Sequence, residues 1–488
     1  MPLTAYDVIV VGGGSAGCVL AARLSEDDDR TVCLLEAGPD YGPFDNGRWP
    51  PEMLDGRLPP TSHDWGDSEG TLPVARILGG CSAHNMCTLM HGAPADYDGW
   101  AELTGESDLA HVDFQPYLDR AREVMTQRVF SESELDPWFQ GLAAASRELG
   151  IAVNEDANDP AATEGIGRVP FNLRGTTRWN AAFGYLDPAR GRDNLTILAD
   201  TLVDRVSLDR ARATGVELVE SGERRTLEAD LVVISAGVYG SPAILTRSGI
   251  GPETELAELG IPVREPLPVG EGLRDHFGVP VRFTPSDEMA AEIREHRRRY
   301  DDASIEGVFK ARTGSCPAGL WDLHLLAAAF PAGDGVVLAL SSMLLQAEWT
   351  GSVRLRSTDP ADLPHVTEID LETGSDLGAA MEGLDLARKL AATEALRGRI
   401  AEELAPGLDS TPESIRAAGR SALTTYFHPV ATCAMGETTD AAGRVHGFEN
   451  LHVVDASIIP RPLRASPHLT VLALAERAAD SLRALQDG

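Results

Sequence analysis

The sequence predicts an α/β protein in two parts: a parallel sheet flanked by helices, and an interleaved α+β domain built on an antiparallel sheet. Residues 6–11 form a short, nearly all-apolar segment that ends in glycines and precedes a helical pattern, as in a buried parallel strand. A second such strand, residues 231–237, also ends at a glycine and returns the chain to that sheet. From residue 279 to about 356 the pattern changes to alternation and short apolar runs, which indicates the antiparallel sheet.

Composition restricts the classes of partner. The 488 residues are 43% hydrophobic, enough for two domains, and the net charge of −33 would repel nucleic-acid phosphates and anionic membranes. The sequence has no uninterrupted apolar run of transmembrane length, so we expect no membrane insertion. Its six cysteines lack CxxC spacing, which favours neither a metal site nor a disulfide framework and is typical of a cytoplasmic protein.

The first chemical motif follows residues 6–11. It is a GxGxxG sequence between a strand and a helix, and a second strand, residues 31–36, closes in Glu36. This strand, loop, helix and strand unit predicts a Rossmann-like dinucleotide site, with the pyrophosphate at the helix N-terminus and the ribose diol at Glu36. A carboxylate would repel a 2′-phosphate, so FAD or NAD is favoured over NADP. The expected contacts of the motif are Gly12, Gly14, Ser15, Ala16 and Gly17.

The segments between these strands have weaker signals. Residues 41–71 contain five prolines and are predicted to be loop. Residues 114–149 are predicted to be helical with a break near 136–137, and residues 376–404 to be one helix. Strands are expected between 195 and 234.

Several separated blocks resemble the glucose-methanol-choline (GMC) flavoprotein oxidoreductases, and the resemblance spans almost the whole chain. The block at residues 78–85 is similar to the family's first signature, in particular to its choline-oxidase-like branch, although Met86 replaces the usual glycine after it. The other blocks are residues 34–38, 235–242, 248–252, 268–276, 426–436, 454–457 and 466–468.

The resemblance implies a domain order and a cofactor, FAD. The FAD-binding domain would cover residues 1–278, with helical and loop insertions at about 40–70 and 100–160. The substrate-binding domain would cover 279–419, and residues 420–488 would return to the FAD-binding domain with the catalytic histidines. Further cofactor contacts implied by the family are Gly79, Asn85, Thr88, Val203, Asp455, Ala456 and Thr470.

Two histidines are the expected catalytic residues. Alcohol oxidation removes the hydroxyl proton while hydride leaves the same carbon for flavin N5. A neutral imidazole can accept that proton near neutral pH, and His428 occupies the position of the family's catalytic histidine. His468 occupies the position of the second polar group, which holds the same oxygen.

His84 carries a separate hypothesis. In the choline-oxidase-like branch, a histidine at this position is bonded to the 8α-methyl group of the flavin. The resemblance therefore raises the prospect of covalent FAD through His84.

The function implied is oxidation of an alcohol to an aldehyde or ketone, with O₂ or a quinone-like acceptor reoxidising the flavin. The alternative is an FAD-containing lyase of hydroxynitrile type on the same fold. An NAD-dependent dehydrogenase would explain the GxGxxG unit but leave the later blocks unexplained. The identity of the alcohol, the electron acceptor and the oligomeric state are open at this point.

Overall fold

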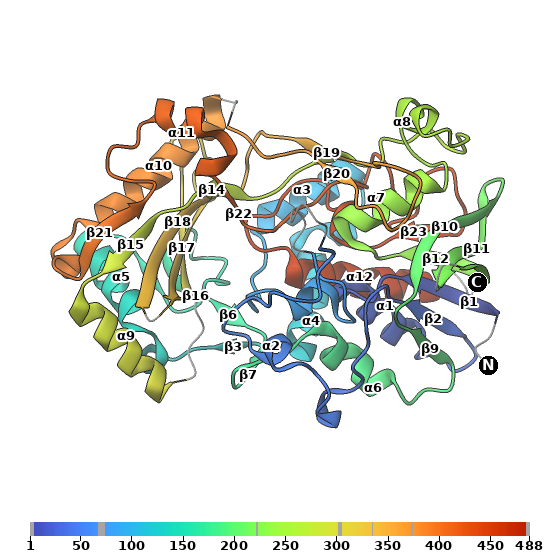
Figure 1. Ribbon diagram of the computed structural model, residues 1–488, viewed down its shortest axis with the longest axis horizontal. Coiled ribbons are helices and arrows are strands. Elements are labelled where there is room, and N and C mark those ends of the chain that lie inside the picture. The colour runs from blue at the N-terminus through green and yellow to red at the C-terminus, as the bar shows by residue number, and fades with distance from the viewer. Residues whose placement is uncertain are drawn as a thin grey trace.

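The computed structural model describes residues 4–66, 74–220, 223–300, 305–333, 335–371 and 374–484. The molecule is elongated, with one large sheet at each end (Figure 1). The end that carries both termini holds the mainly parallel sheet, and the opposite end holds the antiparallel one. Both predicted sheets are therefore present, and the chain is an α/β protein as expected.

The nucleotide-type sheet has the strand order β10-β11-β12-β1-β2-β9, with β23 also paired to β12. The pairs of β1 with β12 and β2, of β2 with β9, and of β12 with β23 are parallel. The strands are β1 (Ala5–Val11), β2 (Val32–Leu35), β9 (Leu195–Leu198), β10 (Leu202–Asp209), β11 (Arg212–Glu220), β12 (Glu223–Ile234) and β23 (Leu451–Val453). This sheet thus combines segments from both ends of the chain.

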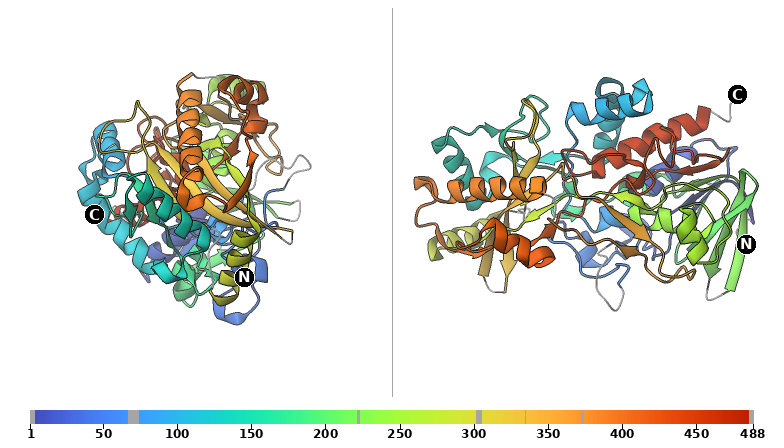
Figure 2. Two further views of the ribbon diagram at one scale, coloured as in Figure 1. Left: turned by 90° about the vertical axis from the view of Figure 1, so that its left-hand side faces the viewer. Right: turned by 90° about the horizontal axis from the view of Figure 1, so that it is seen from above.

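Burial explains the parallel arrangement. The residues of β1 from Val8 to Val11 and all of β2 are buried, as expected for strands covered on both faces. Helix α1 (Ser15–Leu24) packs against α12 (His468–Ala484), which in turn packs against α4 (His111–Val124). Figure 2 shows α12 from above, running along the end of the molecule that carries the termini.

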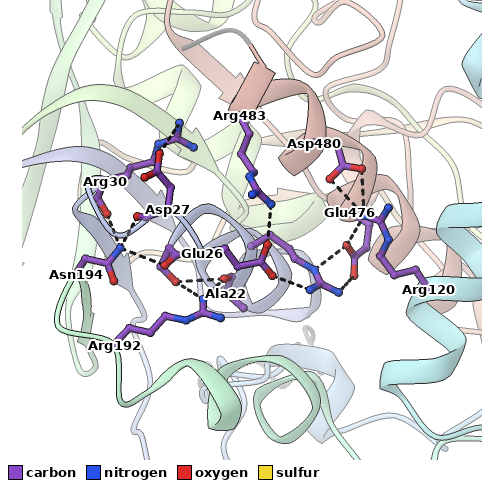
Figure 3. A network of polar contacts seen from close by, with 12 residues as sticks. Ala22, Glu26, Asp27, Arg30, Arg120, Arg192, Asn194, Glu476, Asp480 and Arg483 are labelled. Carbon is purple, nitrogen blue, oxygen red and sulfur yellow. Dashed lines mark hydrogen bonds and ion pairs between the residues drawn. The ribbon is translucent and has the colours of Figure 1, made fainter. Parts of the chain in front are cut away.

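A polar network joins these three helices (Figure 3). Glu476 of α12 is fully buried, and its carboxylate accepts two hydrogen bonds from Arg23 of α1, both of 2.9 Å. Arg120 of α4 donates to the same carboxylate and to Asp480. Because a two-pronged Arg–carboxylate contact fixes orientation as well as distance, the network fixes α12 against α1.

The second sheet is mostly antiparallel, with the order β21-β15-β18-β17-β16-β5-β4 and with β14 and β22 added beside β18. Its strands are β4 (Val153–Asn154), β5 (Gly165–Arg168), β14 (Phe277–Val279), β15 (Arg282–Pro285), β16 (Ile305–Ala311), β17 (Leu323–Ala332), β18 (Gly335–Leu344), β21 (Ile400–Ala405) and β22 (Thr424–Thr425). Strands β4, β5 and β22 come from segments that we assigned to the FAD-binding domain, so this sheet recruits strands across the proposed boundaries. The proposed division into domains itself stays a prediction.

Helices cover one face of this sheet. Helix α5 (Pro137–Glu148) packs on β5 and β17, and α10 (Gly374–Ala391) packs on β17 and β18. The predicted helical region at 114–149 is present as α4 and α5, with the break between them. The single helix predicted over 376–404 is wrong in its second half, because α10 ends at Ala391 and residues 400–405 form β21, which pairs with β15.

The remaining elements are short or peripheral. In the loop expected at 40–70, the described residues form two short helical segments, a 3-10 turn at Phe44–Asn46 and the four-residue α2, and residues 67–70 lie outside the described residues. None of the helices in the described ranges combines the length and apolar character needed to cross a bilayer. The other helices are α2 (Pro51–Leu54), α3 (Pro94–Thr104), α6 (Asp187–Ala189), α7 (Gly237–Arg247), α8 (Glu253–Glu258), α9 (Asp287–Arg299) and α11 (Pro412–Ala418). The other strands are β3 (Arg128–Val129), β6 (Pro170–Phe171), β7 (Leu173–Arg174), β8 (Thr177–Arg178), β13 (Glu271–Leu273), β19 (Gly351–Arg354) and β20 (His365–Val366).

Candidate active site

The GxGxxG loop joins β1 to α1, which begins at Ser15 and continues through Ala16. A Cβ atom on Gly17 would lie 1.8 Å from the carbonyl oxygen of Gly12, so helix and strand pack too closely there for any side chain. Around Gly14, the nearest atom to an added Cβ is 3.9 Å away. The loop therefore leaves room at Gly14, beside the free N–H groups of the α1 N-terminus, which fits a pyrophosphate.

Glu36 lies at the end of β2, as expected. Its carboxylate accepts hydrogen bonds from the N–H groups of Gly13 and Gly38, both of 2.8 Å. Burial raises the pKa of Glu36 to about 7, against the effect of these hydrogen bonds. The N–H of Thr201 donates to the backbone oxygen of Glu36, so the start of β10, with the buried Val203, lies near the expected ribose position.

The segment that carries the first signature lies against the same loop. The N–H of Gly79 donates to the oxygen of Gly13 at 2.7 Å, and the neighbouring Gly80 faces Gly14 so closely that a Cβ would come within 2.5 Å of its Cα. Further along, Thr88 donates to the hydroxyl of Ser466 at 3.4 Å. This segment thus runs from the GxGxxG loop to the N-terminal side of α12.

His84 lies apart from these contacts. Its ring is half-buried, and its Nε2 lies 2.6 Å from the carbonyl oxygen of Ser62. Burial lowers the pKa of His84, so the ring is neutral near neutral pH. The bond between His84 and the flavin stays a prediction.

Asp455 and Thr470 are both engaged with neighbouring protein groups. The Asp455 carboxylate accepts hydrogen bonds from the N–H of Gly237, the hydroxyl of Ser241 and the N–H of Ser457, next to Ala456. It therefore fixes the β23 end against the N-terminus of α7. The Thr470 hydroxyl lies 2.8 Å from the Tyr97 hydroxyl.

His428 belongs to a cluster of rings. Its Nδ1 lies 2.9 Å from Nδ1 of His276, and its ring lies 4.2 Å from that of Tyr426, centroid to centroid. Asp275 anchors the cluster, because its carboxylate accepts the N–H groups of His276 and His428 and the hydroxyl of Thr425. Burial lowers the pKa of His276 to about 4 and raises that of Asp275 to about 7.

His468 begins α12 and contacts the first signature. Its Nδ1 accepts a hydrogen bond from Nδ2 of Asn85 at 3.3 Å, and its buried Nε2 has no partner in the part of the chain that the structure describes. Met86, beside Asn85, packs with Tyr426 against the same apolar cluster of the antiparallel sheet. His428 and His468 therefore both border the junction between the two sheets, although no hydrogen bond joins them.

Sequence reasoning assigned no role to Asp275, His276 or Tyr426. All three lie inside blocks that carry the family resemblance, but their neighbours in sequence do not show that they meet. The fold brings His276 to His428 across 152 residues. The only local signal was the adjacent pair Asp275-His276, because its burial shows only in the fold.

The fold, the glycine cradle and Glu36 together fit FAD. The comparisons with known proteins agree: models of the GMC oxidoreductase family match residues 6–278 and 347–475. The residues between, 279–346, fall outside both matches and contain β15 to β18.

Known proteins resemble the chain over nearly its full length. An oxygen-dependent choline dehydrogenase of Pseudomonas putida is 32% identical, over 98% of this chain and 94% of that protein. The crystal structure of pyridoxine 4-oxidase from Mesorbium loti has a TM-score of 0.85 and 27% identity, covering 98% of this chain and 99% of that one. A formate oxidase of Aspergillus oryzae RIB40 has a TM-score of 0.85 at 23% identity, covering 99% of both chains, and shows the fold alone.

These relatives match nearly the whole chain, including both sheets and every block that carries the resemblance. GMC oxidoreductases bind FAD, and the glycine loop and Glu36 of this chain are built to hold it. The chain therefore belongs to the GMC oxidoreductase family and is an FAD-dependent alcohol oxidoreductase.

Proposed function

We propose that His428 accepts the hydroxyl proton of the alcohol and that His468 donates a hydrogen bond to the same oxygen. Bound FAD supplies the acceptor for the hydride that leaves the carbinol carbon, which gives an aldehyde or a ketone. The observation that supports the proposal is that each imidazole uses Nδ1 in a hydrogen bond, with His276 or with Asn85, and leaves Nε2 without a partner among the described residues.

His276 sets the tautomer of His428. The Nε2 of His276 makes no hydrogen bond with the described residues, while the backbone carbonyls of Leu345 and Leu463 act to raise the pKa of this ring against its burial, so we place the His276 proton on Nε2. A proton on Nε2 leaves Nδ1 of His276 as an acceptor, so His428 donates from Nδ1. Nε2 of His428 then keeps its lone pair, and it makes no hydrogen bond with the described residues.

Asn85 sets the opposite tautomer at His468, with the proton on Nε2 instead of Nδ1. The amide oxygen of Asn85 accepts the N–H of Cys87 at 3.0 Å, so its amide nitrogen faces His468 and donates. Nδ1 of His468 is therefore the acceptor and Nε2 carries the proton. This buried N–H can bind the alcohol oxygen and stabilise the negative charge that develops when the proton leaves.

Electrostatics keep the base neutral. Burial lowers the pKa of His428 well below its usual value, and the nearby His276 and His324 lower it further. Burial also lowers the pKa of His468 to about 4. Both rings are thus neutral at physiological pH. A neutral His428 can accept the hydroxyl proton, and a neutral His468 can donate a hydrogen bond from Nε2.

The test is anaerobic reduction of the flavin by a panel of alcohols. We expect alcohols to bleach the flavin absorbance, and we expect His428→Ala to slow bleaching by roughly 10²–10⁴-fold, the usual contribution of a general base. His446→Ala, at an exposed histidine near the C-terminus, is the control and should leave the rate unchanged. Bleaching by His428→Ala at the wild-type rate would contradict the proposal, whereas bleaching of the wild type contradicts the hydroxynitrile-lyase alternative.

The proposal also covers the acceptor that reoxidises the flavin and the cellular location of the protein. O₂ or a quinone-like acceptor reoxidises the flavin, and peroxide formation in air distinguishes them. All six cysteines are free, which supports a reducing, cytoplasmic location.

Covalent attachment through His84 has its own test. If the bond forms, acid-precipitated wild-type protein stays yellow and His84→Ala releases its flavin to the supernatant. A colourless wild-type pellet contradicts the bond. The hydrogen bond of Nε2 to Ser62 must break before that nitrogen can react.

A further inference from the structure

His324, in the middle of the antiparallel sheet, is buried without hydrogen bonds. Its side chain on β17 is fully buried, and neither Nδ1 nor Nε2 has a partner among the described residues. A buried polar group left unsatisfied is costly, and such groups are rare in folded proteins. The imidazole of His324 therefore has hydrogen-bonding capacity that none of the described residues uses.

The face of β17 that carries His324 is directed toward the catalytic histidines. Side chains alternate along a strand, so His324 shares its face with Leu326 and Ala328. These two residues belong to the apolar cluster on which Met86 and Tyr426 pack. The ring of Tyr426 lies 6.2 Å from that of His324 and 4.2 Å from that of His428. His324 is thus one aromatic ring away from the proposed base.

The charge beside His324 is positive. Lys310 of β16 is its partner in the strand register, and the Lys310 ammonium lies 4.0 Å from the Trp321 ring centre and donates to the oxygen of Ala162. Burial lowers the pKa of Lys310 to about 8, although Asp156 and Asp159 act to raise it, so the amine is mostly protonated at neutral pH.

Asp156 and Asp159 act on Lys310, but the carboxylate that the described residues place at the histidine cluster, Asp275, is already hydrogen-bonded. The Asp275 carboxylate already accepts three hydrogen bonds, from Thr425 and from the backbone of His276 and His428. A cationic substrate head would meet Lys310 and neutral imidazoles there, rather than an acidic or aromatic cage. An uncharged substrate avoids this repulsion.

We propose that His324 is a substrate-binding residue, which donates a hydrogen bond to an oxygen or nitrogen acceptor of an uncharged alcohol. Within the substrate, this acceptor and the hydroxyl held by His428 are separated by about the width of the Tyr426 ring. The carbon skeleton between them contacts Leu326, Ala328 and Tyr426. This inference rests on the proposed function and names its substrate class. It separates this chain from choline, the substrate named for its relatives.

The first experiment uses the wild-type holoenzyme and two matched pairs of alcohols. Tetrahydropyran-4-ylmethanol and cyclohexylmethanol differ in one ether oxygen, and 3,3-dimethylbutan-1-ol and choline differ in the charge of an equally bulky head. We expect kcat/KM for anaerobic flavin reduction to be about 10-fold higher for the ether than for the carbocycle, the value of one buried hydrogen bond. We also expect the neutral alcohol to be oxidised faster than choline.

The second experiment changes His324. His324→Leu should abolish the preference for the ether and leave kcat/KM for cyclohexylmethanol within about threefold, because only the hydrogen bond is lost. His324→Gln keeps an N–H donor and should retain part of the preference. His452→Leu is the matched control, since His452 is a buried histidine with an unpartnered Nδ1 in the other sheet, and it should leave the preference unchanged.

Three results would overturn the inference: equal kcat/KM for the ether and the carbocycle in the wild type, a preference for choline over its neutral analogue, or an ether preference that persists in His324→Leu. If His324→Leu fails to fold, the wild-type pairs and His324→Gln decide. Failure of every alcohol to bleach the flavin instead contradicts the proposed function itself.

Discussion

The two ends of this molecule bind by different means. The nucleotide end uses backbone: close packing at Gly12 and Gly17, open space at Gly14, and the N-terminus of α1. The substrate end, as we propose it, uses side chains: four histidines and a tyrosine drawn from β17, the start of α12 and several loops. Backbone recognition leaves a compact motif in the sequence, whereas side-chain recognition leaves residues scattered along it.

The largest expected effect tests the backbone end. Gly17→Ala should abolish FAD binding, because the new Cβ would lie 1.8 Å from the Gly12 oxygen and force α1 away from β1. The ratio of flavin to protein absorbance after purification measures it. Gly99→Ala in α3 is the control, since an added Cβ there has no neighbour within 4 Å. Normal flavin content in Gly17→Ala would show that the cradle tolerates a side chain.

A smaller effect is expected at the side-chain end, from a residue that acts through another. His276→Leu removes the acceptor that orients His428 and should lower kcat/KM by roughly 10–100-fold while FAD stays bound. His276→Gln offers a carbonyl acceptor in its place and should recover part of the rate. Equal losses in both variants would indicate that His276 only fills space.

The smallest effect is a flat pH profile. The active form of His428 is the neutral one, which is present above its pKa, and burial places that pKa well below 6.5. Values of kcat/KM should therefore change little as pH rises from 6.5 to 8 and should fall only in more acidic solution. Asp275→Asn is the control, because burial raises the pKa of Asp275 to about 7 and its titration could add a separate limb. A limb near pH 6.5 that survives in Asp275→Asn would contradict a buried neutral base.

The difference between the two ends also explains what the sequence could predict. The GxGxxG unit and Glu36 are local, so their arrangement followed from spacing alone. The pairing of His276 with His428 depends on β14 and β22 lying side by side, which no local pattern shows. Likewise, residues 400–405 have an apolar pattern compatible with a helix, but pairing with β15 decides their conformation.

Substrate identity is the part furthest from sequence. Strands β15 to β18 lie between the two stretches that match the family models, so those models give least guidance where we propose that the substrate binds. The choline dehydrogenases that this chain resembles at 32% identity suggest one substrate, and the charge around His324 favours another. The comparison of choline with its neutral analogue decides between them.

The way both sheets collect strands has a consequence for biosynthesis. Strand β23 joins β12, and β22 joins β14, so each sheet receives a late strand from the C-terminal part of the chain. On the ribosome, the antiparallel sheet can be completed only after residues 424–425 have emerged and the parallel sheet only after residues 451–453, so neither is complete when the N-terminal half of the chain has been made. A C-terminal truncation that removes β23 therefore leaves the parallel sheet incomplete, and one that also removes β22 leaves both sheets incomplete.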